Sequence, residues 1–187
     1  MKKETKFDLL IKYIFVFLVA SAIGRFYEFF LILGEGNFNY IHYFPTSIYT
    51  LIFALPYGIA IMLVYFLFQI LDKYKFTKKS FILKIITGTI LIDIAELITG
   101  LVGVNLAGVM PWDYSNHILN YKGLISVQIT IRWAILVAII SKVGYGQIVT
   151  FMKKPLSRKI KKLTIGTLII WAIYLIILFG LNNFGIF

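Results

Sequence analysis

The residues of this chain that could do chemistry are charged side chains embedded in long apolar stretches. Inside such a stretch each charge costs about 2.5 to 3.5 kcal/mol on insertion scales, so it faces protein or water rather than lipid. Charges in this setting pair with one another, bind an ion or substrate, or relay protons. The candidates for a substrate or ion site are Arg25, Glu28, Asp93, Glu96 and Arg132. The alternative is an ion network that only holds helices in register.

Spacing places these charges on shared helix faces. Arg25 and Glu28 are three residues apart, and Gln128 lies one turn before Arg132, which adds Gln128 to the candidates. The third apolar stretch carries a stripe of polar residues that continues into small ones: Thr89, Asp93, Glu96, Gly100 and Gly103. Small residues let helices approach closely, so this stripe is predicted to face another helix.

The elements that must position these residues are membrane-length helices. The chain has 187 residues, of which 60% are apolar, and a mean hydropathy of +0.88. About 20 apolar residues cross the 30 Å hydrocarbon core as a helix. The sequence therefore predicts an all-α, polytopic transmembrane helical bundle that forms a single domain over residues 1–187. About five spans are expected, at residues 13–33, 48–71, 81–103, 124–141 and 163–181.

Depth groups the charges into one layer. At 1.5 Å per helical residue, Arg25, Asp93 and Arg132 each lie about 18 Å from the cytoplasmic end of their predicted span. Glu96 lies about one turn further out. Arg132 is therefore predicted to pair with Asp93 or Glu96, and Arg25 with Glu28 or with the same carboxylates.

The distribution of cations predicts the orientation. Most of the 19 Lys and Arg residues precede the first span, lie between the second and third, or lie between the fourth and fifth. Cation-rich loops stay in the cytoplasm, which puts the N-terminus inside and the C-terminus outside. The net charge of +11 then matches anionic headgroups. The lipid bilayer is the predicted partner, and nucleic acid is not.

The first apolar stretch also resembles a signal peptide. Lys2 and Lys3 precede an apolar run that reaches Ala20-Ser21-Ala22, which has the form of a cleavage site. Cleavage there would remove residues 1–22. The apolar run continues to Leu33, long enough to span, which favours a retained helix.

The predicted outer loop after the third span carries an unusual aromatic and acidic segment. Trp112, Asp113, Tyr114 and Ser115 are followed by Asn120 and Gly123. Aromatic residues anchor segments at headgroup depth. We expect this loop to cover the charged layer as a lid, with Asp113 facing protein and Trp112 at the interface. Asp113 and Asn120 would tie the loop to the helix ends.

These residues resemble a known family. Gly24, Glu28 and Glu96, and above all Trp112-Asp113-Tyr114-Ser115 with Asn120, Gly123 and Trp133, are similar in order and spacing to the CmpB-like ABC-transporter type IV permeases. The resemblance covers roughly residues 20–140 and leaves the fifth predicted span outside. It implies a permease-like transporter component in the bacterial cytoplasmic membrane.

Such a permease would need a separate ATPase subunit or another membrane subunit. The chain has no G-x-x-x-x-G-K-[ST] pattern, so it does not itself bind ATP in that way. Residues 142–162 would offer the docking surface. Gly144 to Gln147 and Pro155 predict a turn-rich connection there.

Two other classes of function stay open. An intramembrane enzyme on lipid or envelope substrates could use Asp93, Glu96 and Asp113 as acid and base groups, although no catalytic motif occurs. A structural or regulatory membrane subunit is the third class. No cofactor and no metal are predicted, because His42 and His117 lack metal-ligand spacing.

Overall fold

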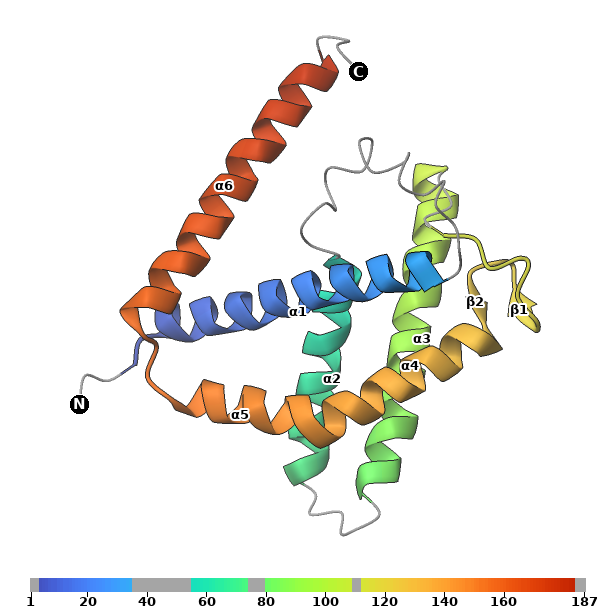
Figure 1. The fold of residues 1–187 in the computed structure, drawn as a ribbon, viewed down its shortest axis with the longest axis horizontal. Coiled ribbons are helices and arrows are strands. Elements are labelled where there is room, and N and C mark those ends of the chain that lie inside the picture. The colour runs from blue at the N-terminus through green and yellow to red at the C-terminus, as the bar shows by residue number, and fades with distance from the viewer. Residues whose placement is uncertain (1–3, 35–54, 74–79, 109–111, 184–187) are drawn as a thin grey trace. The chain divides into compact units, whose positions relative to one another are not determined.

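Most of the described chain is helical. The computed structural model describes residues 4–34, 55–73, 80–108 and 112–183. The helices are α1 (Lys6–Gly34), α2 (Leu55–Lys73), α3 (Ser80–Ala107), α4 (Val127–Ile139), α5 (Tyr145–Lys153) and α6 (Arg158–Asn183). A π-helical turn, η3 (Ile140–Gly144), joins α4 to α5, and the short strands β1 (Asn120–Tyr121) and β2 (Ile125–Ser126) precede α4 (Figure 1). The predicted all-α class is confirmed.

Three segments of the described chain are long and apolar enough to cross a membrane. They are Lys6–Tyr27, Pro56–Lys73 and Val127–Lys153, with mean hydropathies of 2.0, 1.3 and 1.7. The predicted spans 81–103 and 163–181 lie within α3 and α6. The count of five spans stays a prediction, and residues 48–54 of the predicted second span lie outside the described residues.

The helical segment over the predicted fourth span, residues 124–141, begins and ends later than that span. Residues 124–126 belong to the connection that contains β2, and the helix continues past residue 141 to Lys153. The predicted turn at Gly144 to Gln147 is helical instead. A glycine inside a helix costs only about 1 kcal/mol relative to alanine, which packing of the neighbouring Tyr145 outweighs. Pro155 does lie between helices, in the connection 154–157.

Rows of exposed isoleucine and valine run along the helices. On α3 every fourth residue from Ile82 to Val102 is about half exposed or more, and the same holds on α4 from Val127 to Ile139. Such continuous apolar rows are rare on soluble proteins. On a membrane helix they form the lipid-facing side, which leaves the opposite side of α3 for Thr89, Asp93 and Glu96.

Residues 60–150 form one of two compact units. Its core contains Val64 and Phe68 of α2, Ile92 of α3, Val137 of α4 and Ile140 of η3. Helices α3 and α4 approach closely at Gly88, where an added Cβ would lie 2.8 Å from Val137 Cγ1. Gly88 therefore leaves room for a close helix contact. Gly100 does the same for the side chain of Leu124.

An ion pair joins α2 and α3 in this unit and holds Tyr145. Lys84 Nζ lies 2.6 Å from Asp72 Oδ1, and the hydroxyl of Tyr145 donates to Asp72 Oδ2 at 2.6 Å. The same ammonium group lies 5.2 Å from the ring centroid of Phe68 and 4.7 Å from that of Tyr145. These contacts hold Tyr145, the first residue of α5, in a helical segment where the sequence predicted a turn.

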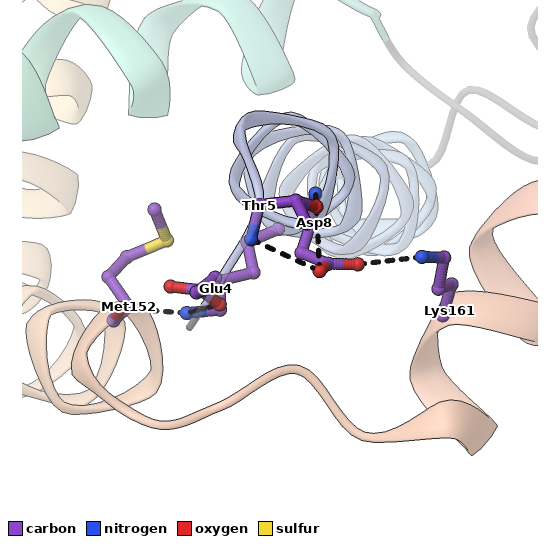
Figure 2. A network of polar contacts seen from close by, with 6 residues as sticks. Glu4, Thr5, Asp8, Met152 and Lys161 are labelled. Atoms are coloured by element: carbon purple, nitrogen blue, oxygen red, sulfur yellow. Dashed lines mark hydrogen bonds and ion pairs between the residues drawn. The ribbon is translucent and has the colours of Figure 1, made fainter. Parts of the chain in front are cut away.

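Residues 1–59 and 151–187 form the other unit. Thr5 caps α1, because its hydroxyl accepts from the backbone of Asp8 at 3.1 Å while Asp8 accepts from the Thr5 backbone at 3.3 Å. The second oxygen of Asp8 lies 2.6 Å from Lys161 Nζ of α6 (Figure 2). The start of α1 is thereby tied to the start of α6.

Lys12 gives the same unit a second polar contact. Its side chain is fully buried, pairs with Glu4 at 2.5 Å and donates to the carbonyl of Met152 at 2.9 Å. The last carbonyls of a helix lack partners within it, so Lys12 satisfies one at the end of α5. Helices α1, α5 and α6 therefore meet at one set of charged residues.

Candidate functional site

Residues 112–126 form a hairpin loop that one asparagine holds together. The side-chain amide of Asn120 donates to the carbonyls of Ser115 and His117, each at 3.0 Å. Its oxygen accepts from the backbone of Gly123 at 3.0 Å, and β1 pairs antiparallel with β2. Gly123 has φ +68°, a conformation that glycine adopts without strain. Asn120 and Gly123 therefore shape the hairpin loop itself; the expected tie from Asn120 to a helix end is replaced by these local bonds.

The aromatic residues fix this loop against the start of α4. Trp112 Nε1 donates to the carbonyl of Leu124 at 2.8 Å, and Tyr114 donates its backbone N–H to Gly123 at 2.8 Å. The ring of Tyr114 stacks on His117 at 5.2 Å between centroids. His117 Nδ1 lies 3.0 Å from the hydroxyl of Ser126, the N-cap of α4. Hydrogen bonds therefore connect the hairpin loop to the residues that begin α4.

Glu96 connects this loop to two helices. One carboxylate oxygen accepts from the hydroxyl of Tyr114 at 3.1 Å. The other accepts from Trp133 Nε1 of α4 at 3.0 Å. All three side chains are half-buried. A half-buried carboxylate on α3 is therefore held on one side by the hairpin loop and on the other by α4.

Asp93, one turn before Glu96, accepts a hydrogen bond from a different hydroxyl group. Its Oδ2 accepts from Thr130 Oγ1 of α4 at 2.9 Å. Its Oδ1 is buried and, among the described residues, has no hydrogen-bond partner. Two carboxylates thus lie next to each other between α3 and α4, where oxygen acceptors can receive a cation or a hydrogen-bond donor.

Comparison with known proteins identifies the family. The sequence profile described as Putative ABC-transporter type IV, the CmpB-like family, matches residues 15–181. The chain belongs to this family. No curated protein and no solved structure matches the chain.

The family match is longer than the sequence resemblance suggested. It reaches residue 181 and includes most of α6, so the expectation that the fifth span lies outside was wrong. The CmpB-like match and the apolar helices together fit a membrane transporter component. In this CmpB-like chain, three residues that carry the resemblance share one hydrogen-bonded cluster, because Tyr114 and Trp133 both donate to Glu96.

The structure corrects the orientation expected for Asp113. Its side chain is exposed and accepts from the backbone of Ser115 at 2.8 Å, so it neither faces protein nor ties the loop to a helix end. This local bond also holds the pKa of Asp113 below its usual value. Tyr114, rather than Asp113, is the loop residue that bonds to the carboxylate of Glu96.

The other predicted site residues lie on α1 and α4. Gln128 is exposed on α4, and Arg132 is half-buried one turn later. Arg25 is half-buried on α1, in the other compact unit. The side chain of Glu28 lies outside the described residues. The pairing of either arginine with a carboxylate stays a prediction.

Sequence reasoning missed the role of Thr130. It lies between Gln128 and Arg132, whose amide and charge are the more unusual groups in an apolar stretch. A threonine is common in membrane helices, where its hydroxyl bonds across to a neighbouring helix. The pairing with Asp93 spans 37 residues, and no local pattern signals it.

Proposed function

We propose that this CmpB-like protein is the permease-like membrane subunit of a bacterial transporter. Its ligand site is the carboxylate layer of Asp93 and Glu96, and the hairpin loop is the cover of that site. The observation that carries the proposal is the bond between Glu96 and Tyr114 at 3.1 Å. Ionisable residues at membrane depth mark ion or substrate pathways by default, and this one is hydrogen-bonded to the hairpin loop.

The proposed orientation follows the basic residues. Exposed cations surround the connection between α5 and α6: Lys153, Lys154, Arg158, Lys159 and Lys162. In the hairpin loop the cation is Lys122. By the positive-inside rule the α5–α6 connection is cytoplasmic and the hairpin loop is outside. The protein then resides in the plasma membrane with five spans, its N-terminus inside and its C-terminus outside.

Single cysteines test this orientation. The chain contains no native cysteine, so an added one is the sole thiol. Asn116→Cys in the hairpin loop is expected to react with an impermeant thiol reagent in whole cells. Ser157→Cys, exposed between α5 and α6, should react only after permeabilisation. Labelling of Ser157→Cys in intact cells would overturn the orientation.

A transporter subunit without its own ATP-binding motif needs an ATPase partner. Tagged full-length protein, purified from native membranes in mild detergent, is expected to bring a polypeptide with a P-loop motif. The purified complex should hydrolyse ATP. Lys153→Gln with Lys154→Gln at the α5–α6 connection should reduce the recovered ATPase at least severalfold, because the proposed docking surface loses charge.

Lys122→Gln is the matched control, since it removes an exposed cation from the opposite proposed side. It should leave the recovered ATPase unchanged. Purification of the chain without an ATP-hydrolysing partner, together with turnover of a lipid substrate in the absence of ATP, would replace the permease with an intramembrane enzyme.

A further inference from the structure

Threonine hydroxyls in these helices usually bond to their own backbone. Several donate to the carbonyl four residues earlier, at 2.7 to 2.9 Å: Thr87, Thr99, Thr150 and Thr164. Thr89 departs from this pattern. It is only 6% exposed, and within the described chain its hydroxyl has no hydrogen-bond partner. A buried hydroxyl in this state has an oxygen available for a ligand.

Thr89 lies one helical turn before Asp93. Residues four apart share a face of an α-helix, so the Thr89 hydroxyl and the Asp93 carboxylate lie on the same side of α3. The oxygen of Asp93 that Thr130 does not contact is the buried one without a partner among described residues. Two buried oxygens on adjacent turns are therefore both without a protein donor in the described chain.

A second carboxylate lies next to these oxygens. Glu96 follows one turn later with both of its oxygens engaged by neutral donors, Tyr114 and Trp133. The single lysine of α3, Lys84, is held by Asp72 at 2.6 Å. A buried carboxylate with an open oxygen is costly unless a cation or donor reaches it.

We propose that Asp93 Oδ1 and Thr89 Oγ1 bind a small monovalent cation, with Thr130 orienting the Asp93 carboxylate. Hard cations take oxygen ligands, and carboxylate and hydroxyl oxygens are the two kinds present. A divalent ion prefers several carboxylates, and the described residues hold no group of three or more His, Cys, Asp or Glu side chains that fits a metal. The inference rests on the proposed function for its role, which is to couple cation entry to the ligand site.

The test measures cation binding by the purified full-length protein in lipid nanodiscs. Its melting temperature is recorded at fixed pH while NaCl, KCl or LiCl replaces choline chloride at constant ionic strength. A ligand that binds only the folded state raises the melting temperature with concentration. At least one of the three salts should give a saturating rise for the native protein and none for Asp93→Asn.

Threonine variants keep the test valid if Asp93→Asn does not accumulate. Thr89→Val should raise the half-maximal cation concentration about tenfold, the equivalent of one lost ligand. Thr89→Ser, which keeps the hydroxyl, should restore the native value. Thr99→Val is the matched control, because the Thr99 hydroxyl is exposed and bonds to Ala95, and it should behave as native.

Identical melting temperatures in all four salts would overturn the cation site. A shift by Thr99→Val as large as that by Thr89→Val would do so too. Neither result touches the ATPase partner, whose recovery is measured separately, so failure of the cation site and failure of the permease assignment are distinguishable.

Discussion

Glu96→Ala is expected to destabilise the protein by about 2 to 4 kcal/mol, because it strands two half-buried donors at once. Tyr114 loses its acceptor in the hairpin loop and Trp133 loses its acceptor on α4. Thermal unfolding of the purified protein in nanodiscs measures the effect. The hairpin loop should also become more susceptible to protease, since Tyr114 no longer fixes it to α3.

Asp113→Asn is the control for this prediction. It lies in the same loop, is exposed, and an asparagine oxygen can still accept from Ser115. Its melting temperature should stay close to native. An equal loss for both variants would mean that the loop, rather than its bond to Glu96, determines the stability.

A finer variant separates the two bonds of Glu96. Glu96→Gln keeps one oxygen acceptor but turns an NH₂ group toward one of the two donors. In the Trp133→Phe background that donor conflict is absent, so Glu96→Gln should cost less there than in the native protein. Strict additivity of the two changes would show that Glu96 and Trp133 do not interact.

Asp72→Ala is expected to lower the free energy of unfolding by a similar amount, about 2 to 4 kcal/mol. The side chain of Lys84 is 11% exposed and that of Asp72 is 46% exposed. Removing the acid leaves a buried ammonium group beside the rings of Phe68 and Tyr145, and stranding a buried charge costs more than the pair contributes. The expected loss is smaller than the largest losses for fully buried ion pairs, because the side chain of Asp72 is partly exposed to solvent. Chemical or thermal unfolding in nanodiscs is the measurement.

Lys84→Met is the matched comparison. It removes the buried charge instead of stranding it, and the bond from Tyr145 to Asp72 stays possible. Its cost should therefore be clearly smaller than that of Asp72→Ala. If Lys84→Met is the more damaging change, cation–π packing on Phe68 and Tyr145 dominates and the ion pair is secondary.

Local signals in the sequence were sufficient for several conclusions. Helix-length apolar runs predicted the all-α class and the membrane, because hydrophobic length is a property of contiguous residues. The spacing of Trp112-Asp113-Tyr114-Ser115, Glu96 and Trp133 indicated the CmpB-like family, which the match to residues 15–181 confirms.

Local sequence signals gave the wrong prediction for Asp113 and for the segment around Gly144. Asp113 looked like the functional carboxylate of the loop, but a backbone N–H two residues away satisfies it. Gly144 and Gly146 looked like a turn, but Tyr145 is bonded to Asp72 on α2. At Gly144 and Gly146 the local preference is about 1 kcal/mol, and the contact that decides comes from a residue 73 positions away; at Asp113 the deciding contact is itself local.

The pairing at the candidate site was decided by tertiary structure alone. Glu96 bonds to residues 18 and 37 positions away, and Asp93 to one 37 positions away. These bonds exist because Gly88 lets α3 approach Val137 of α4 and because Asn120 shapes the hairpin loop. The sequence by itself determined that carboxylates lie within an apolar helix. Helix packing determined which donors reach them, since hydrogen bonds need partners within about 3 Å and only the folded chain sets that distance.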